Sequence, residues 1–450
     1  MGGESEREGH VETTDMPEPA GAGQARDGRG PVTYGLLGRT LGHSWSPRIH
    51  EILGSTPYQL IELEPDEVAP YVREGRWLGL NVTIPYKSQA AQLADERTAR
   101  VERLGVANTL LRRPDGSILA DNTDVLGFGW MLRRFCLREL GAEAEEALRD
   151  REVLVLGSGG ASQAVQAALE DCGARVVVVS RKGPERYEGL TERRPHAALV
   201  VNTTPVGMYP NCPASALDDG ALADMHELRG VLDVVYNPER TGICIAAERV
   251  GLPSESGLAM LVAQALYSSQ LWQGHDLDEA LVSTIEDEIR RETRNVILIG
   301  MPGCGKTSCG RELSRLTGRP HVDLDHAFAK RFGRSAAEVI ESKGEPTFRA
   351  METEVLAAFA RKSGQVLSCG GGVVTRPENL ALMRQNGVVA MLDRPVEELS
   401  SRGRPISRTR GVEALAAERM PLYRAWADVV ITCTGSARGD ALEISRRLGV

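Results

Sequence analysis

Short apolar runs recur along the chain, and they alternate with longer stretches in which apolar residues are spaced as in amphipathic helices. The runs are continuous and rich in β-branched residues. Strands that are buried on both faces of a parallel sheet have this pattern, because neither face needs polar side chains. Such strands in alternation with helices predict an α/β fold. The runs lie at 32–38, 78–85, 152–157, 174–180, 197–202, 230–236, 295–300, 365–370 and 388–393.

A polar helical stretch at 276–293 divides these runs into two groups. Residues 1–30 are rich in Gly, Glu, Pro and Arg and contain no apolar core, which predicts disorder. The predicted organisation is therefore a disordered segment at 1–30, a substrate-binding lobe at 31–124, a nucleotide-binding lobe at 125–275, a closing helix and linker at 276–293, and a second nucleotide-binding module at 294–450.

Composition and charge exclude several classes of protein. The chain is 42% hydrophobic and 26% charged, which is typical of globular proteins. Its net charge of −9 argues against a nucleic-acid partner, since such proteins need a basic face. No apolar run approaches the roughly 20 residues that span a bilayer, so we expect no membrane association. The eight cysteines have no zinc-ligand spacing, which favours reduced thiols and a cytoplasmic protein, with a homo-oligomer left open.

The run at 152–157 leads into a glycine-rich turn and an alanine-rich helix. Gly157 and Gly159 would permit a tight turn and the close approach of a pyrophosphate, which N–H groups at the start of the helix would hold. Ser162 replaces the last glycine of the strict GxGxxG pattern, so a plain packing turn is the alternative.

The residues after the next run distinguish between two dinucleotides. An NAD site would place a carboxylate there, whereas this chain has Ser180, Arg181 and Lys182. Cations suit a 2′-phosphate and predict NADP(H) as the cofactor, with solvated surface charges as the alternative.

Polar clusters that precede this loop suggest a substrate site. Ser44 and Ser46 are spaced to point the same way from an extended segment, and Thr83 belongs to the polar face of a strand that ends near Lys87. A molecule rich in hydroxyl groups needs such side chains, and a carbonyl that is reduced needs a proton donor at its oxygen. Lys87, oriented by a carboxylate such as Asp124, could supply that proton. Each cluster alone is more often a capped turn or an exposed loop.

Residues 31–292 resemble shikimate 5-dehydrogenase over the whole module, through GRTLGHSWSP, NVTIPYK, GVANTL, DNTD, GSGGAS, VVNTTPVGM, LDVVYNP and GLAMLVAQA in this order. The resemblance implies a two-lobed α/β module, with a shikimate-binding lobe, a Rossmann lobe for NADP(H), and a catalytic pair of Lys87 and Asp124. It assigns shikimate binding to Ser44, Ser46, Thr83, Lys87, Asn108, Asp124 and Gln264, with Tyr236 nearby. It assigns NADP(H) binding to Gly157, Ser158, Gly159, Gly160, Ala161, Ser180, Arg181, Lys182, Asn202, Thr203, Val234 and Gly257.

The run at 295–300 leads into a second phosphate-binding pattern. The sequence GMPGCGKT satisfies GxxxxGK[ST] with Gly300, Gly305, Lys306 and Thr307. Backbone N–H groups of such a loop surround phosphates, the lysine reaches the β- and γ-phosphates, and the threonine hydroxyl binds Mg²⁺. The loop predicts an ATP–Mg²⁺ site but does not identify the acceptor of the phosphate.

Residues downstream of this loop indicate what kind of molecule accepts the phosphate. Asp323 and Asp325 stand two apart at a predicted strand end, so their side chains would share one face, with a helix cap as the alternative. Arg349 could pair with a carboxylate in bidentate fashion, and the glycines at 370–372 would let the backbone approach a small ligand. For any single arginine, a solvated surface charge is the alternative.

Residues 294–450 resemble shikimate kinase, through GMPGCGKT, DLD, FR, GGG, RP and LYR in this order. The resemblance implies a P-loop kinase α/β domain with a parallel sheet that phosphorylates the 3-hydroxyl of shikimate, with Lys306 and Asp325 catalytic. It assigns ATP binding to Gly303, Cys304, Gly305, Lys306, Thr307, Ser308 and the lid residue Arg404, shikimate binding to Asp325, Arg349, Gly371 and Arg424, and metal binding to Thr307 and Asp323. The lid is shorter than is usual, since only Gly403 separates Arg402 from Arg404.

Together these patterns predict a bifunctional enzyme of aromatic amino-acid precursor synthesis, which reduces 3-dehydroshikimate with NADPH and then phosphorylates shikimate with ATP. Three alternatives remain from the sequence. The first half could oxidise quinate or shikimate, the folds could serve a ligand-sensing regulator, or one half could be inactive, in which case the short lid makes the kinase the half to suspect.

Overall fold

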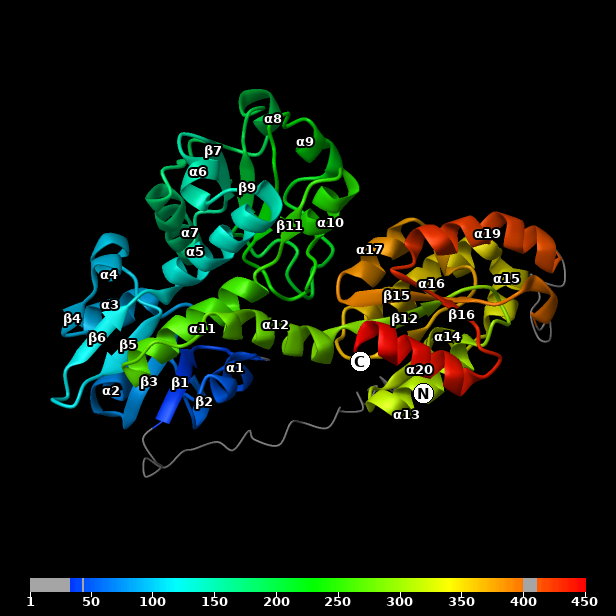
Figure 1. Cartoon of the computed structure of the whole chain (residues 1–450), viewed down its shortest axis with the longest axis horizontal. Coiled ribbons are helices and arrows are strands. Elements are labelled where there is room, and N and C mark those ends of the chain that lie inside the picture. The colour runs from blue at the N-terminus through cyan, green and yellow to red at the C-terminus, as the bar shows by residue number, and fades with distance from the viewer. Residues whose placement is uncertain (1–32, 43, 400–410) are drawn as a thin grey trace, which may run out of the picture.

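The structure is a computed structural model, and it describes residues 33–42, 44–399 and 411–450. In those residues the strands form three sheets that follow one another along the chain. Figure 1 shows the first two sheets with their helices on one side of the molecule and the third on the other, joined by α12 (Ala280–Thr293). The segment 1–30, predicted to be disordered, lies outside the described residues.

The first sheet mixes parallel and antiparallel strands in the order β2-β1-β3-β5-β6-β4. Strand β1 is parallel to β2 and β3, whereas β5 is antiparallel to β3 and β6. One face of β3 buries Leu80 and Val82 in an apolar core, and Asn81 on the other face bonds to α11 (Leu258–Gln273). The elements are β1 (Thr33–Gly38), α1 (Ser46–Ile52), β2 (Tyr58–Glu62), α2 (Pro65–Glu74), β3 (Trp77–Val82), α3 (Lys87–Leu93), β4 (Glu96–Arg97), α4 (Ala99–Leu104), β5 (Thr109–Arg112) and β6 (Ile118–Asp121).

The second sheet is parallel throughout, in the order β11-β10-β9-β7-β8. Alternate residues of β7 enter two different cores, Val153 and Val155 on one face and Leu154 and Leu156 on the other, which explains the continuous apolar run. The elements are α5 (Thr123–Phe135), the π-helical turn η1 (Cys136–Leu140), α6 (Ala144–Leu148), β7 (Glu152–Leu156), α7 (Gly160–Asp171), β8 (Arg175–Val179), α8 (Leu190–Arg193), β9 (Leu199–Asn202), α9 (Asp219–Ala223), β10 (Val231–Asp233), α10 (Gly242–Arg249) and β11 (Ser254–Glu255).

The third sheet is also parallel, in the order β13-β14-β12-β15-β16. Its central strand β12 again serves two cores, with Val296 and Leu298 in one and Ile297 and Ile299 in the other. The elements are β12 (Asn295–Ile299), α13 (Lys306–Thr317), β13 (His321–Asp323), α14 (Leu324–Phe332), α15 (Ala336–Lys343), α16 (Glu345–Ala360), β14 (Val366–Ser368), η2 (Val373–Thr375), α17 (Glu378–Arg384), β15 (Gly387–Asp393), η3 (Val396–Glu398), α19 (Val412–Trp426), β16 (Val429–Thr432) and α20 (Ala437–Leu448).

Helix α12 connects the halves and is more than a surface helix. It buries Val282, Ile285 and Ile289 against α1 and α11, and its Glu286 is fully buried in an ion pair with Arg134 of α5. A single residue, Arg294, separates the end of α12 from the start of β12. The helix is therefore packed on the first half while it continues into the central strand of the second.

Every apolar run predicted to be a strand contains one, so the α/β prediction is confirmed. The sequence did not predict β2, β4, β5, β6, β11 or β16, which are short or carry a polar face. Among the described residues, no helix combines the length and apolar character that crossing a membrane requires. The division of the chain at 124, 275 and 293 stays a prediction.

Close packing of α5 on α11 leads to the first testable prediction. A Cβ added at Gly127 would lie 2.8 Å from backbone atoms of α11, whereas one added at Gly129, two residues further along α5, would meet only a flexible arginine end at 3.5 Å. Gly127→Ala should therefore lower the free energy of unfolding by roughly 1–3 kcal/mol, because the helices must separate. Gly129→Ala should raise it by up to about 1 kcal/mol, because alanine favours helix over glycine.

Denaturation followed by tryptophan fluorescence measures both variants, since four of the five tryptophans lie before residue 280. Equal effects of the two substitutions would contradict the packing of α5 on α11.

Candidate active sites

A lysine and a carboxylate meet at the start of two helices in the first half. Lys87 is the first residue of α3, and Asp124 lies in the first turn of α5. The Lys87 Nζ lies 2.5 Å from Oδ2 of Asp124, and the side chains are only 19% and 13% exposed. An ammonium group held in this way, shielded from most of the solvent, can donate a proton to an oxygen placed beside it.

Asn108 holds the other oxygen of this carboxylate. Its amide nitrogen donates to Oδ1 of Asp124 at 2.9 Å and lies 3.4 Å from Oε1 of Gln264. The Asn108 oxygen accepts from the backbone N–H of Thr123 at 2.7 Å, which fixes the amide orientation. The structure thus brings four predicted residues, Lys87, Asp124, Asn108 and Gln264, into direct contact.

A buried hydroxyl network supports these residues, and sequence reasoning did not identify it. Ser268 in α11 is fully buried, and its hydroxyl lies 2.9 Å from that of Thr109 and 3.0 Å from that of Thr123. It also accepts from the Asn81 amide at 2.9 Å. The signal that could have revealed it is a pair of serines inside the largely apolar helix LAMLVAQALYSSQLWQ.

The remaining predicted substrate residues lie on neighbouring segments. Strands β1 and β3 are parallel, so Ser44 after β1 and Thr83 after β3 leave the sheet at the same edge. The prediction that Ser44 and Ser46 lie on one extended segment is wrong. Ser46 begins α1, and its N–H donates to the Ser44 hydroxyl at 3.2 Å. Tyr236 packs against the apolar cluster of α1, α11 and α12.

The first glycine-rich turn has room for a phosphate. Gly157 has a φ of +107°, which side-chain-bearing residues rarely adopt, and Gly159 precedes α7. A Cβ built at Gly159 or Gly160 would meet no atom within 4 Å, so the loop from Gly157 to Ala161 is open to a ligand. Ser162 stabilises the turn, since its hydroxyl donates to the Gly157 carbonyl at 2.8 Å. The departure from GxGxxG is therefore compatible with a dinucleotide loop.

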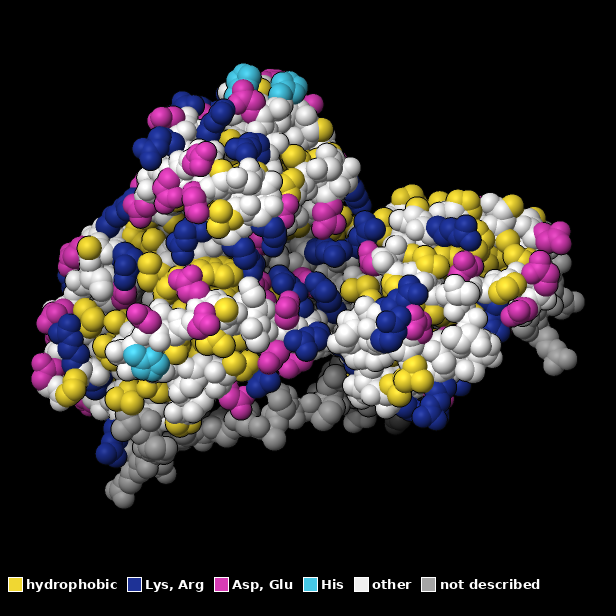
Figure 2. All heavy atoms as spheres, viewed as in Figure 1, with side chains coloured by type: hydrophobic (Ala, Val, Ile, Leu, Met, Phe, Trp, Pro, Cys, Tyr) yellow, Lys and Arg dark blue, Asp and Glu magenta, His cyan; other side chains and the backbone are white. Residues whose placement is uncertain are grey.

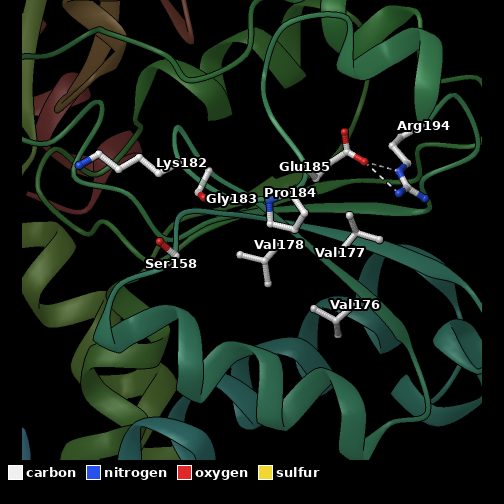
Figure 3. A pocket seen from close by; sticks show the side chains of 10 residues that line it. Ser158, Val176, Val177, Val178, Lys182, Gly183, Pro184, Glu185 and Arg194 are labelled. Atoms are coloured by element: carbon white, nitrogen blue, oxygen red, sulfur yellow. Dashed lines mark hydrogen bonds and ion pairs between the residues drawn. The ribbon is translucent and has the colours of Figure 1, made fainter.

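A cavity of about 560 Å³ opens beside β8, as Figure 3 shows, and Ser158, Ser180 and Lys182 line it. The nearby Glu185 carboxylate accepts hydrogen bonds from Arg193 at 2.8 Å and Arg194 at 2.9 Å, and these bonds lower its pKa. Glu185 is thus already engaged, whereas Arg181 and Lys182 are exposed. This arrangement suits an anionic phosphate better than a ribose hydroxyl that needs a free carboxylate.

Among the predicted nicotinamide residues, Asn202 contacts a buried carboxylate, and Thr203 and Gly257 lie close to backbone carbonyls. Asn202 ends β9 and donates to Oδ1 of Asp233 at 3.0 Å, and burial raises the pKa of Asp233 to about 7. Thr203 bonds through both its N–H and its hydroxyl to a carbonyl of β7 at 2.8 Å. A Cβ at Gly257 would lie 2.1 Å from the carbonyl oxygen of Val234, so this contact requires glycine.

The second phosphate loop joins β12 to α13. Gly305, with a φ of +103°, lies just before the helix, and Lys306 is folded back so that Nζ donates to the Gly300 and Met301 carbonyls at 2.9 and 3.0 Å. The Thr307 hydroxyl donates to Oδ2 of Asp323 at 2.6 Å. The other predicted loop residues are the half-buried Gly303, the buried Cys304 and the exposed Ser308.

The pairing of Asp323 with Asp325 on one strand face is wrong. Strand β13 ends at Asp323, and Asp325 already belongs to α14. Asp323 caps this helix, since its Oδ1 accepts from the N–H groups of Asp325 and His326 at 3.0 and 3.1 Å. The helix-cap alternative is therefore correct, and Oδ2 of Asp323 faces Thr307.

A hydroxyl and a carboxylate at a P-loop suit Mg²⁺, which usually keeps water and phosphate among its ligands. In the described ranges, no three His, Cys, Asp or Glu side chains gather as a metal site of their own. Thr307 and Asp323 thus fit a metal that arrives with a nucleotide. Arg404, predicted to bind ATP, lies outside the described residues.

Close to the P-loop, three consecutive glycines let charged side chains approach the backbone. Arg349 is 9% exposed and pairs with the 7% exposed Glu352 at 2.8 Å. A Cβ at Gly372 would lie 2.0 Å from the Arg349 guanidinium carbon, and one at Gly370 would lie 2.9 Å from an oxygen of Asp325. The predicted residues Asp325, Arg349 and Gly371 therefore surround one glycine turn, together with Glu352, which the sequence reasoning missed.

The structure does not bring Arg424 to this turn. Its side chain is 63% exposed and lies 3.4 Å from Asp393. Arg419, five residues earlier in α19, is only 2% exposed, and its Nη1 donates to the Gly371 carbonyl at 3.2 Å. Its Nε lies 3.8 Å from a carboxylate oxygen of Glu418. Within the described residues, the buried Nη2 and Nε have no hydrogen-bond partner, although guanidinium N–H groups are normally satisfied.

Comparisons with known proteins agree with this geometry. The family described as shikimate dehydrogenase substrate binding domain matches residues 36–110, and the shikimate kinase family matches residues 302–448. The shikimate dehydrogenase (NADP(+)) of Clostridium perfringens is 32% identical over 57% of this chain and 98% of its own length. That of Oleidesulfovibrio alaskensis is 36% identical over 54% of this chain and 90% of its own length.

A solved structure shares the fold of the first half. It is that of a chorismate mutase/shikimate 5-dehydrogenase fusion protein from Clostridium acetobutylicum, which is 31% identical, covers 58% of this chain and 97% of its own, and has a TM-score of 0.52. The chain therefore belongs to the shikimate dehydrogenase family, and it carries a shikimate kinase domain in its second half.

Proposed function

We propose that the chain is a bifunctional enzyme that converts 3-dehydroshikimate into shikimate 3-phosphate in two steps. The observation that carries the proposal is the presence in one chain of the shielded Lys87–Asp124 pair with a dinucleotide loop, and of a P-loop lysine with a buried arginine–glutamate pair. The family membership of the first half and the kinase domain of the second support the same two reactions. The product of the first site is the substrate of the second, which argues against a catabolic direction for the first half.

In the first step, Lys87 gives a proton to the carbonyl oxygen of 3-dehydroshikimate. NADPH, when bound at the loop from Gly157 to Ala161, supplies the hydride to the carbonyl carbon. Asp124, itself held by Asn108, keeps the ammonium group in place, and the low exposure of the pair excludes competing water. We propose that the hydroxyl and carboxylate groups of the substrate are bound by Ser44, Ser46, Thr83, Asn108 and Gln264, with Tyr236 beside them.

We propose that NADP(H) binds with its 2′-phosphate against Arg181 and Lys182. Support comes from the exposure of both cations and from the engagement of the nearby Glu185 by two arginines. The remaining contacts would come from Ser158, Gly159, Gly160 and Ser180 on the phosphate side and from Asn202, Thr203, Val234 and Gly257 on the nicotinamide side.

In the second step, the 3-hydroxyl oxygen of shikimate forms a bond to the γ-phosphorus of ATP, and the bond from that phosphorus to the bridging oxygen breaks. Thr307 and Asp323 would hold Mg²⁺, which would offset the phosphate charge. Lys306 is within the loop and exchanges its carbonyl partners for phosphate oxygens. Asp325 orients the acceptor hydroxyl and accepts its proton as the new bond to phosphorus forms. The other loop residues, Gly303, Cys304, Gly305 and Ser308, would surround the phosphates through their backbone.

We propose Arg419 as a shikimate ligand of the kinase in place of Arg424. A buried guanidinium beside Gly371, whose Nη2 and Nε have no hydrogen-bond partner among the described residues, is suited to a carboxylate ligand, which can accept two hydrogen bonds at once. Arg349 would be the second cation at this site.

We also propose a cytoplasmic location, which the free and mostly buried cysteines support; a homo-oligomer stays a prediction.

Two lysine variants test whether the chain holds two independent activities. Lys87→Ala should lower NADPH consumption with 3-dehydroshikimate by about 100-fold or more, since a positioned proton donor contributes at least this much. Lys306→Ala should lower ADP formation from ATP and shikimate by about 100-fold or more, since the charge on the transferring phosphoryl group loses a cationic partner. Coupled absorbance assays measure both rates, and each variant is the control for the other. Loss of both activities in either folded variant would contradict the proposal.

A second pair of variants identifies the arginine that binds shikimate in the kinase. Arg419→Lys keeps a charge but loses the bidentate geometry. It should raise the KM for shikimate in the kinase assay by roughly 10- to 100-fold, which is the change expected when one charged hydrogen bond is lost. Arg424→Ala, five residues away on the exposed side, should change this KM by less than about twofold. The opposite ranking would restore Arg424 as the ligand.

A further inference from the structure

The loop between β10 and α10, residues 234–241, connects the dehydrogenase site to the kinase half; we refer to it as the nicotinamide-side loop. Both of its ends are held by the buried Asp233. Its Oδ1 accepts from the N–H of Val235 at 2.9 Å, and its Oδ2 accepts from the hydroxyl of Thr241 at 2.6 Å. The base of the loop is thereby fixed within the dehydrogenase.

The first half of this loop forms part of the proposed dehydrogenase site. The Val234 N–H donates to the carbonyl of Asn202 at 3.0 Å, and the N–H of Gly257 donates to the carbonyl of Val235 at 3.0 Å. Tyr236 follows and packs on the cluster of α1, α11 and α12. A displacement of this loop would therefore move groups beside both the nicotinamide and the substrate.

The tip of the loop contacts the kinase half directly. The Glu239 N–H donates to Oδ1 of Asn386 at 2.8 Å, and the Arg240 N–H donates to the carbonyl of Gln385, also at 2.8 Å. Glu239 is only three residues after Tyr236. Helix α17, which ends next to these kinase residues, faces α10 of the dehydrogenase, as Figure 1 shows.

Two arginines of the connecting segment hold the carboxylate of Glu239. Arg294 binds it in bidentate fashion, with N–O distances of 2.5 and 2.8 Å, and Arg290 lies 3.3 Å away. The Glu239 side chain is only 15% exposed. Figure 2 shows basic and acidic side chains gathered where the two parts of the molecule meet. The loop tip is therefore bound through backbone and side chain alike.

The kinase residues in this contact are rigidly placed. Asn386 is 5% exposed and directly precedes β15, and its carbonyl accepts from the N–H of Asn295, the first residue of β12, at 2.7 Å. Arg319 of the kinase donates to the carbonyls of Arg291 and Arg294 at the end of α12. The surface that meets the loop is thus anchored to the amino-terminal ends of two neighbouring kinase strands.

We propose that the kinase half positions the nicotinamide-side loop for the dehydrogenase reaction, with Asn386 and Arg294 as positioning residues. The proposal rests on the dehydrogenase function proposed above. Without the Asn386 acceptor, the Glu239 N–H loses its partner in a largely buried contact, and the loop must shift to reach water. That shift weakens binding at Val234 and Tyr236, so the KM values rise more than kcat falls.

The kinase reaction is the internal control. The P-loop follows the carboxyl end of β12, whereas Asn295 and Asn386 lie at the amino ends of β12 and β15. A change at Asn386 is therefore separated from the ATP site by the length of the sheet, and it should leave the kinase parameters unchanged.

Two variants of Asn386 in the full-length chain test the proposal. Asn386→Leu keeps the branching at Cγ and removes the acceptor, and it should raise the KM for NADP⁺ and for shikimate in the oxidation direction by about tenfold, as expected for one buried N–H left unpaired. Asn386→Asp keeps an accepting oxygen and should stay within about twofold of the original chain. The KM values of the kinase for ATP and shikimate should be unaltered in both.

Original KM values in a folded Asn386→Leu chain would overturn the proposal. If this variant does not fold, Glu239→Gln, which weakens the contact from the loop side, should raise the same KM values, and its failure to do so overturns the proposal equally. Absence of dehydrogenase activity in the original chain would instead contradict the proposed function. In that case the dissociation constant of NADP⁺ is measured by titration without turnover. A higher dissociation constant in Asn386→Leu than in the original chain supports the positioning of the loop, and an equal one overturns it.

Discussion

A parallel strand has to turn away from its sheet at the carboxyl end, and in this chain that turn creates both nucleotide sites. Gly157 and Gly305 take φ values of +107° and +103°, so the backbone reverses sharply and a helix starts within three residues. The free N–H groups of that helix then face whatever ligand enters the turn. The other site residues are placed relative to these turns, as Asn202 is at the end of β9 and Asp323 at the end of β13. Strand polarity therefore decides where chemistry can occur in each half.

The direction of the strands also determines which end of the kinase sheet meets the dehydrogenase. The dehydrogenase contacts the kinase at the amino ends of β12 and β15, and the P-loop lies at the carboxyl end of β12. The P-loop thus lies at the end of its sheet that is opposite the contact with the dehydrogenase. In the arrangement that we propose, the kinase half supports a loop of the dehydrogenase through Asn386 and Gln385.

The sequence predicted the strands that are buried on both faces, since alternate residues such as Val153 and Leu154 enter different cores and no polar face interrupts the apolar run. It also located both glycine-rich turns and the Lys87–Asp124 pair. It failed where three-dimensional packing decides the outcome. Residues Arg419 and Arg424 lie in one helix, and only Arg419, four residues from the buried Tyr423, shares its inward face. Ser268 was missed because its partners come from three distant segments of the chain.

The central claim is that one chain carries out two consecutive reactions on the same carbon skeleton. The most direct measurement supplies 3-dehydroshikimate, NADPH, ATP and Mg²⁺ to the purified full-length chain and identifies the products by mass spectrometry. The product should be shikimate 3-phosphate, with NADP⁺ and ADP formed in equal amounts and shikimate as the intermediate that accumulates when ATP is omitted. Recovery of unreacted 3-dehydroshikimate, or of shikimate alone with ATP and Mg²⁺ present, would contradict it.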